Sequence, residues 1–318
     1  MKKYLLGIDL GGTTIKFGLI LPTGEIVHQW SIPTNTEQAG SNITTEMIAS
    51  IQQVLQQKQI GLDEIIGAGM GCPGTVDRTE GSIRNAFNLG WTTPQLVRAQ
   101  FQENLGLELV IENDANVAAL GEKWQGSGED AANLVFMTLG TGVGGGVIVN
   151  NQIVEGVGGA GGEIGHFPVI CSHEFSCTCG NSNCLETLAS ATGIVNLAKK
   201  YRKETETSLN HFEELSSAQV FQEAQAGDKV ALQVVDEISA YLGTACSVMA
   251  NLLNPSVIVI GGGVSSAKEF LLDKIAHHFE QGVFPTVKET TQLKLATLGN
   301  DAGILGAAYL VKEGENNV

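Results

Sequence analysis

The chain has 318 residues, enough for two domains of ordinary size, and 43% of them are hydrophobic, which suffices for real cores. Its 34 acidic residues outnumber 18 Lys and Arg residues, and the net charge of −16 argues against general nucleic-acid binding, which requires neutralisation of phosphates. Because no apolar run approaches the roughly 20 residues of a membrane span and no secretion signal opens the chain, we expect a soluble, cytoplasmic protein that binds neither nucleic acid nor membrane.

The first part of the chain consists of expected strands, glycine turns and two expected helices. Short apolar runs predict strands over residues 4–9, 15–20, 25–30, 65–70 and 107–111. Apolar residues at helical spacing predict a helix over 43–55, and an alanine-rich stretch predicts another over 115–124. Strands that alternate with helices indicate an α/β architecture.

The opening pattern returns near residue 134. IDLGGTTIKFGLI and MTLGTGVGGGVIV both read as strand, glycine turn and strand, at an offset of about 130 residues, which suggests that two halves share one fold. Further helices are expected over 187–200, 230–252, 267–279 and 302–310, and further strands over 257–260 and 293–298. A polar connection joins the first two of these helices.

Three expected strands end in glycine clusters: Gly11-Gly12, Gly140-Thr141-Gly142 and Gly261-Gly262-Gly263. Glycine lets backbone N–H groups approach a phosphate oxygen, and nearby side chains add hydroxyl donors (Thr13, Thr14, Thr141) and a positive charge (Lys16). One such cluster can be only a tight turn, whereas three favour phosphate binding. None has the P-loop or GxGxxG context, since the first two lead into strands. We expect the two hairpins to hold phosphates in a cleft between two domains.

Two aspartates follow expected strands. Asp9 can hold Mg²⁺ through water beside a nucleotide, or it can simply form the turn. Asn113-Asp114 precedes an alanine-rich helix, which is also the signature of an N-cap. A helix N-terminus lowers the pKa of an aspartate, so Asp114 would be a weak base. Such a base still suits phosphoryl transfer, where it mainly orients the hydroxyl and takes its proton late.

A cysteine cluster lies in the second half. The motif Cys177-x-Cys179-x4-Cys184, with His166 upstream, supplies three thiolates and one imidazole, the donors of a closed tetrahedral zinc site. The alternative is a surface loop with free thiols, which would be prone to oxidation. Four protein ligands leave no vacant position, so a bound zinc would be structural. Whether the neighbouring Cys171 or His173 contributes stays open.

In this order, the motifs resemble the ROK (repressor, open reading frame, kinase) family of sugar kinases over nearly the whole chain. They are Asp9-x-Gly-Gly-Thr-x-x-Lys16, Gly71-x-Pro-Gly74, Asn88-Leu-Gly-Trp91, Glu112-Asn-Asp-Ala-Asn116, Leu139-Gly-Thr-Gly142, Gly162-Glu-Ile-Gly-His166, Cys177-x-Cys-Gly-x-x-x-Cys-x-Glu186, Ile260-Gly-Gly-Gly-Val264 and Asp301-Ala-Gly303. Within the family, the chain looks most similar to bacterial ATP-dependent glucokinases. It departs at Asn183, where the family usually has glycine, but asparagine tolerates a left-handed backbone.

The resemblance implies an actin/hexokinase-like (RNase H-like) two-domain α/β fold with a duplicated core and a zinc-binding insertion in the second domain. The small domain would comprise residues 1–115 and 302–318, and the large domain residues 116–301. The implied reaction is phosphorylation of glucose by ATP at the 6-hydroxyl, with Mg²⁺ and a structural Zn²⁺. Family members often form homodimers and sometimes tetramers.

The resemblance also assigns roles to residues. Asp114 would be the catalytic base. The sugar would be held by Gly74, Asn88, Asn113, Asp114, Glu163, His166 and Glu186. Mg-ATP would be held by Asp9, Gly11, Gly12, Thr13, Thr14, Lys16, Gly140, Thr141, Gly142, Gly261, Gly262 and Gly263. Zinc would be held by His166, Cys177, Cys179 and Cys184.

Two alternatives remain. The sugar could be N-acetylmannosamine, N-acetylglucosamine, fructose or allose instead of glucose. The protein could also be a sugar-binding regulator, because the family includes repressors; those begin with a helix-turn-helix, whereas here a strand begins at about residue 3, so no DNA-binding domain is expected.

Overall fold

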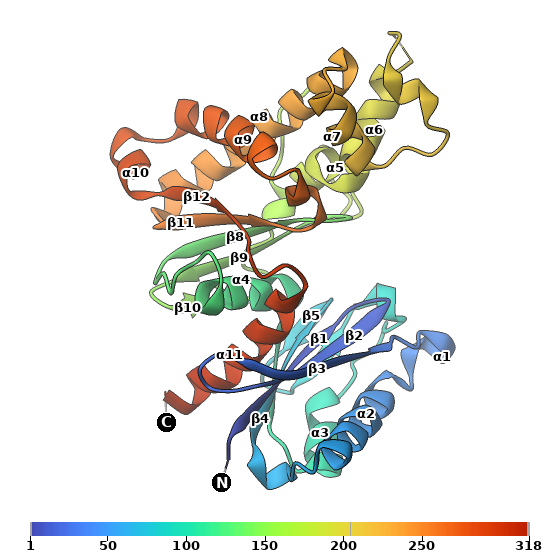
Figure 1. Cartoon of the computed structure of the whole chain (residues 1–318), viewed down its shortest axis with the longest axis vertical. Coiled ribbons are helices and arrows are strands. Elements are labelled where there is room, and N and C mark those ends of the chain that lie inside the picture. Colours follow the sequence, from blue (N-terminus) through green and yellow to red (C-terminus); the bar gives the residue numbers. More distant parts are fainter. Residues whose placement is uncertain (1, 204, 317–318) are drawn as a thin grey trace. The chain divides into compact units, whose positions relative to one another are not determined.

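The computed structural model describes residues 2–203 and 205–316 (Figure 1). These residues form two compact units. Unit 1 takes in the chain up to Asp130, the segment Glu155–Gly161 and the chain from Asn300 onward, and unit 2 comprises Ala131–Val154 and Gly162–Gly299. Unit 1 continues past the expected boundary at residue 115 because helix α4 (Asp114–Gln125) packs against the C-terminal helix α11 (Ala302–Asn316).

Unit 1 is built on a five-stranded sheet with the order β3-β2-β1-β4-β7. Its strands are β1 (Tyr4–Leu10), β2 (Thr14–Ile20), β3 (Ile26–Pro33), β4 (Ile65–Cys72) and β7 (Leu109–Asn113). The β1–β2 and β2–β3 pairs are antiparallel, whereas β1, β4 and β7 run parallel. Asp9 pairs with Gly71, and Cys72 pairs with Asn113. The carboxyl ends of three parallel strands therefore bring the first aspartate and the turn before Asp114 to one edge of the sheet.

Helices cover both faces of this sheet. The alternate side chains Leu6, Ile8 and Leu10 share a core with α2 (Ile43–Lys58) and α3 (Val97–Leu105). On the other face, α11 lies against β1 and β4. A methyl group at Gly7 or Gly69 would overlap the backbone of α11, so this helix can lie so close only over glycine. Unit 1 also contains the short helix α1 (Glu37–Gly40) and a hairpin of β5 (Thr75–Asp77) and β6 (Ser82–Arg84).

Unit 2 repeats this topology. Its sheet has the order β10-β9-β8-β11-β12, with an antiparallel hairpin followed by parallel strands, as in unit 1. The strands are β8 (Leu134–Leu139), β9 (Val143–Val149), β10 (Gln152–Ile153), β11 (Val257–Gly261) and β12 (Gln292–Leu295). The common strand order agrees with the internal repeat in the sequence. β12 is shorter than the expected strand over 293–298.

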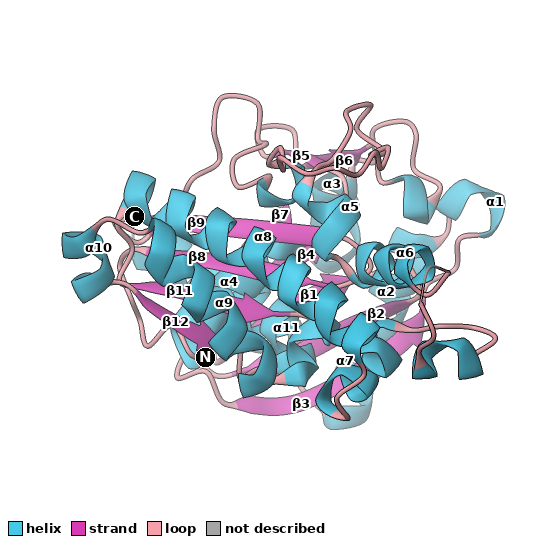
Figure 2. Ribbon diagram, turned by 90° about the horizontal axis from the view of Figure 1, so that it is seen from above, coloured by secondary structure: helices cyan, strands magenta, loops and turns pink. Residues whose placement is uncertain are grey.

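The core of unit 2 lies between its sheet and a layer of helices that includes α8 and α9 (Figure 2). The helices are α5 (Leu185–Ala189), α6 (Ala191–Tyr201), α7 (Ser217–Gln225), α8 (Lys229–Leu253), α9 (Glu269–Gly282) and α10 (Pro285–Thr290). The single helix expected over 187–200 is wrong, because Ser190 has an extended backbone and its side chain caps α6. α8 ends at a left-handed Asn254, directly before Pro255.

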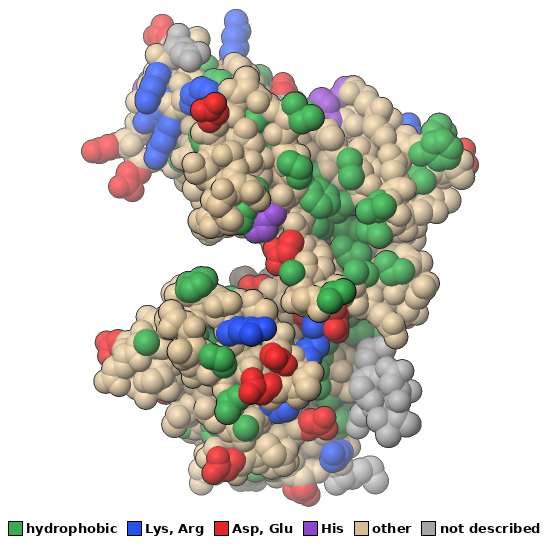
Figure 3. All heavy atoms as spheres, turned by 180° about the vertical axis from the view of Figure 1, so that it is seen from behind, with side chains coloured by type: hydrophobic (Ala, Val, Ile, Leu, Met, Phe, Trp, Pro, Cys, Tyr) green, Lys and Arg blue, Asp and Glu red, His purple; other side chains and the backbone are tan. Residues whose placement is uncertain are grey.

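The described surface has two features relevant to partners. None of the helices in residues 2–203 and 205–316 combines the length and apolar character of a membrane span. Unit 2 exposes several large apolar side chains, and Figure 3 shows apolar side chains gathered on one face of this unit. The large apolar side chains that unit 2 exposes include Ile170, Val248, Leu252 and Phe284.

Candidate active site and metal centre

The first glycine cluster forms the turn between β1 and β2 in unit 1. Gly11 N donates to Thr14 O at 3.1 Å, and Thr34 Oγ1 donates to Gly11 O at 2.7 Å, so hydrogen bonds from two segments fix the turn. A Cβ atom on Gly12 would lie 3.1 Å from Asn88 Nδ2. The structure therefore brings Asn88 against the expected phosphate hairpin. Thr13, at the tip of this hairpin, is exposed.

Asp9 and Lys16 face each other across the same hairpin. Lys16 Nζ lies 3.5 Å from Asp9 Oδ2. Burial raises the pKa of Asp9, and the neighbouring ammonium group opposes that effect. Thr14 and Lys16 also line a cavity of about 380 Å³ together with Asn300 and Asp301. This end of unit 1 thus offers a carboxylate, a cation and a hydroxyl beside exposed backbone.

Asp114 is the first helical residue after β7, and Asn113 is the N-cap. Asn113 Oδ1 accepts hydrogen bonds from Ala115 N at 2.9 Å and from Asn116 N at 3.3 Å. Asp114 Oδ1 accepts one bond from Ala115 N at 2.8 Å. The capping role therefore belongs to Asn113 and not to Asp114.

The expectation that the helix would lower the pKa of Asp114 is wrong. Asp114 is exposed at the surface of unit 1, but protein atoms crowd around its carboxylate, and the resulting loss of hydration raises its pKa to about 6. The hydrogen bond from Ala115 N opposes the rise, and the negative charge of Asp9 adds to it. A carboxylate with this pKa is a stronger base than an ordinary aspartate and is still mostly ionised at neutral pH.

A buried ion pair supports the turn, and the sequence analysis missed its cation. The Glu112 side chain is only 4% exposed, and its Oε1 accepts from Asn113 N at 2.7 Å and from Asn116 Nδ2 at 2.9 Å. Arg78 Nε donates to Glu112 Oε2 at 2.9 Å, and Arg78 also pairs with Glu155 at 3.0 Å. The guanidinium group neutralises a carboxylate that would otherwise be costly to bury. Arg78 comes from the β5–β6 turn, so no local spacing indicates this pairing.

The backbone conformation and the close packing at position 74 both require glycine. Its φ of 89° is left-handed, and a Cβ atom there would lie 2.7 Å from Arg84 O and 2.9 Å from Ala86 N. The chain after β4 can therefore pack tightly against the segment that leads to Asn88.

The second glycine cluster forms the β8–β9 turn in unit 2. Gly140 N donates to Gly142 O at 2.9 Å. The start of α6 holds the turn from outside: Ala191 N donates to Gly140 O at 2.9 Å, and Thr192 Oγ1 donates to Thr141 O at 3.0 Å. The turn is thus as firmly fixed as its counterpart, but it carries no ionisable side chain.

The third cluster and one expected sugar ligand lie beside this turn. Gly262 has a φ of 84°, and a side chain there would meet the backbone of Leu139 at the end of β8. Glu186, in the first turn of α5, accepts a hydrogen bond from Val143 N at 3.0 Å through Oε2. Unit 2 therefore brings two glycine clusters and a carboxylate together.

The four expected zinc ligands converge. Their ligand atoms all lie within 4.8 Å of one another. His166 Nδ1 is 3.6 Å from Cys177 Sγ, and Cys179 Sγ is 3.7 Å from Cys184 Sγ. A tetrahedral zinc with Zn–S of about 2.3 Å and Zn–N of about 2.0 Å needs separations of about 3.8 Å between sulfurs and about 3.6 Å between nitrogen and sulfur. The side chains present therefore fit this ion.

His166 and three neighbouring residues have distinct positions relative to the cluster. The other ring nitrogen of His166, Nε2, lies 3.8 Å from Glu163 Oε2, so the imidazole has one nitrogen toward the thiols and one toward an expected sugar ligand. Cys171 and His173 lie outside the converging set. Asn183 has a φ of 55°, which confirms the expected left-handed conformation.

Comparisons with known proteins agree with these motifs. The sequence profile of the ROK family matches residues 5–314. A glucokinase of Halalkalibacterium halodurans is 44% identical over 99% of this chain and 97% of its own length. A ROK family glucokinase from Streptomyces griseus, solved in complex with glucose and AMPPNP, is 30% identical, with a TM-score of 0.78 over 98% of this chain and 100% of that one.

A third relative supports the fold. The ROK hexokinase from Thermus thermophilus is 28% identical, and its structure matches 99% of both chains with a TM-score of 0.84. The duplicated topology and these likenesses establish the actin/hexokinase-like α/β fold. A match over nearly the full length confirms the resemblance seen in the sequence, and the chain belongs to the ROK family.

Proposed function

We propose that this protein is a sugar kinase that transfers the γ-phosphoryl group of ATP to the 6-hydroxyl of glucose, giving glucose 6-phosphate and ADP. The observation that carries the proposal is the turn after β7, where Asp114, with a pKa raised to about 6, lies at the sheet edge that also bears Asp9. The relative from Streptomyces griseus, solved with glucose and an ATP analogue, supports the choice of substrates.

In this proposal Asp114 acts as general base. Its carboxylate orients the 6-hydroxyl and accepts the hydroxyl proton as the O–P bond forms, while the bond from the γ-phosphorus to the bridging oxygen of ADP breaks. The other hydroxyls of the sugar are bound by groups that accept and donate hydrogen bonds, as specificity for a polyol requires. These ligands are the backbone of Gly74 and the side chains of Asn88 and Asn113 in unit 1, and the side chains of Glu163, His166 and Glu186 in unit 2.

The nucleotide is bound by the glycine clusters. Backbone N–H groups of the two hairpins and of Gly261–263 donate to phosphate oxygens, and Lys16 adds a positive charge. Asp9 would hold Mg²⁺ through water, since its carboxylate lies at the end of β1 beside the hairpin. The bound cation supplies neutralisation of phosphate charge.

We also propose that His166, Cys177, Cys179 and Cys184 hold a structural zinc ion. The ion would fix the loop that carries two sugar ligands, and the imidazole would keep Nε2 as a fixed donor. Metal analysis of the purified protein should find one zinc per chain, and Cys179→Ala should lose it and raise the KM for sugar. A wild-type protein free of zinc at full activity would refute the site.

A panel of sugars tests the substrate. Initial rates should give the highest kcat/KM with glucose among glucose, fructose, allose, N-acetylglucosamine and N-acetylmannosamine. A higher kcat/KM for one of the other sugars would leave the kinase chemistry intact and replace the substrate.

Two further expectations stay proposals. If the protein is a sugar-binding regulator, calorimetry will detect glucose binding while ATP turnover is absent. The expected homodimer or tetramer can be tested by light scattering coupled to size-exclusion chromatography, in which a single monomer mass would contradict it.

A further inference from the structure

His173 is a buried histidine that the proposed site does not use. It lies in the loop before the cysteines and is only 4% exposed. Lys200 Nζ lies 2.8 Å from His173 Nδ1, and His173 Nε2 lies 2.7 Å from Glu237 Oε1. Because an ammonium group can only donate, Nδ1 accepts and the proton is on Nε2, which donates to the carboxylate. Both ring nitrogens are therefore occupied by protein partners.

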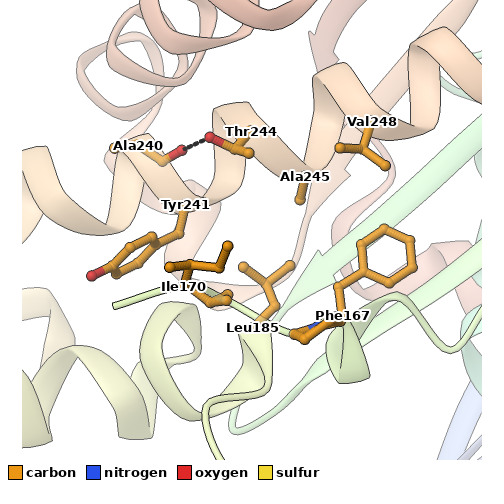
Figure 4. A pocket seen from close by; sticks show the side chains of 10 residues that line it. Phe167, Ile170, Leu185, Ala240, Tyr241, Thr244, Ala245 and Val248 are labelled. Atoms are coloured by element: carbon orange, nitrogen blue, oxygen red, sulfur yellow. Dashed lines mark hydrogen bonds between the residues drawn. The ribbon is translucent and has the colours of Figure 1, made fainter. Parts of the chain in front are cut away.

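The carboxylate that receives this bond belongs to a saturated network. Tyr201 at the end of α6 donates to Glu237 Oε2, and Tyr241 donates to Oε1 from one turn further along α8. Burial raises the pKa of Glu237, but these hydrogen bonds outweigh it and hold the pKa below its usual range. Figure 4 shows the Tyr241 ring beside an apolar groove, with its hydroxyl directed away from Phe167 and Val248. A fully satisfied network of this kind is rigid.

The network reaches the metal loop, residues 162–184, through Asn183. Its Nδ2 donates to His173 O at 2.6 Å, and its Oδ1 accepts from Phe175 N at 2.9 Å. Asn183 N also donates to Phe175 O at 2.8 Å. Asn183 directly precedes the ligand Cys184, so unbroken contacts run from α8 through His173 to the metal cluster. A glycine at position 183 would allow the same backbone but could not form the two side-chain bonds.

We propose that His173 and Asn183 are positioning residues that anchor the metal loop independently of the metal and thereby slow the loss of zinc. The proposal rests on the zinc site proposed above. Ligands that the fold already holds in place lose less freedom on binding an ion, and partners of this outer kind commonly contribute about 10–100-fold in metal affinity. It further implies that the segment from His173 to Asn183 keeps its conformation when the ion is removed, whereas His166 and the neighbouring Glu163 still depend on the ion.

Zinc transfer from the full-length protein to the chromogenic chelator 4-(2-pyridylazo)resorcinol tests the anchor without reference to catalysis. Asn183→Gly should release zinc about 10–100-fold faster than wild type, because it keeps the left-handed backbone and loses only the side-chain bonds. His173→Ala should act similarly, and His173→Gln should restore part of the retention because glutamine can both donate and accept. His211→Ala, at an exposed histidine of the same unit, is the matched control and should release zinc at the wild-type rate.

Release by Asn183→Gly at the wild-type rate would overturn the proposal, whether or not the His173 variants fold. Amide hydrogen exchange of the metal-free protein separates this proposal from the zinc site. If wild type contains no zinc but the Phe175 and Asn183 amides stay protected, and lose protection in Asn183→Gly, the anchor stands and the zinc site falls. Unprotected amides in metal-free wild type would refute a metal-independent anchor.

Discussion

The two units share one strand order but carry different chemical groups on it. In the aligned hairpins, Asp9 of unit 1 corresponds to Thr138 of unit 2, and Lys16 corresponds to Gly145. A Cβ atom on Gly145 would meet Ile164 and the Gly162 carbonyl, so the metal loop lies where unit 1 has its lysine. The hairpin of unit 1 carries charged side chains, whereas the hairpin of unit 2 has glycine where the metal loop packs against it.

This difference suggests that the two units contribute differently to catalysis and to sugar binding. Unit 1 contains the proposed base and the charged hairpin, and unit 2 contains an uncharged hairpin tied to Glu186 and to the metal loop. Changes at the base and the charged hairpin of unit 1 should therefore act mainly on kcat, and changes at Glu186 and the metal loop of unit 2 mainly on the KM for sugar.

The largest effect is expected at the base. Asp114→Asn should lower kcat by about 10²–10⁴-fold, because the amide cannot accept the hydroxyl proton, and should leave sugar affinity nearly unchanged. Steady-state kinetics and glucose calorimetry measure the two quantities. Asp63→Asn, at an exposed carboxylate of unit 1, is the control and should behave as wild type. Near-normal turnover of Asp114→Asn would show that the carboxylate only supports the turn.

The matching change in unit 2 should act on affinity. Glu186→Ala removes a charged acceptor of the Val143 N–H and a proposed sugar ligand, and we expect the KM for sugar to rise about 10–100-fold with kcat changed only a few-fold. Glu174→Ala, at an exposed carboxylate of the metal loop, should leave the KM unchanged. If Glu186→Ala lowered kcat as much as Asp114→Asn, the division between the units would be wrong.

Features of the two units that depend on a local sequence pattern could be predicted from the sequence. Apolar runs located the main strands, and glycine turns and cysteine spacing located the hairpins and the metal cluster. The break at Ser190 was missed because the apolar spacing continues across it, and only the extended backbone separates α5 from α6.

Properties that depend on contacts between residues far apart in the sequence could not be predicted from the sequence. The pKa of Asp114 was predicted in the wrong direction, since the adjacent helix is visible in the sequence whereas the surrounding protein is not. Arg78 and Glu112 meet only because the β5–β6 turn folds over the end of β7. His173 likewise finds Glu237 on a helix far along the chain.

The raised pKa of Asp114 makes a prediction about pH. A base must be ionised to accept a proton, so kcat/KM should be level near pH 7 and fall as the pH drops through about 6, by about tenfold for each further unit. Rates between pH 4.5 and 8, with protein integrity checked by circular dichroism at each pH, measure this limb. An acid limb near pH 4 would indicate an Asp114 carboxylate with ordinary hydration.

The smallest expected effect concerns the contact between the β8–β9 hairpin and the Glu186 side chain in unit 2. A methyl group in Gly142→Ala would contact the end of the Glu186 side chain, which can move aside but would then weaken its bond from Val143 N. A net cost of about 0.5–1.5 kcal/mol corresponds to a two- to tenfold rise in the KM for sugar. Gly140→Ala is the matched change in the same turn, because a methyl group there meets no atom within 4 Å. Equal KM values for sugar in both variants would show that Glu186 binds sugar without help from the hairpin.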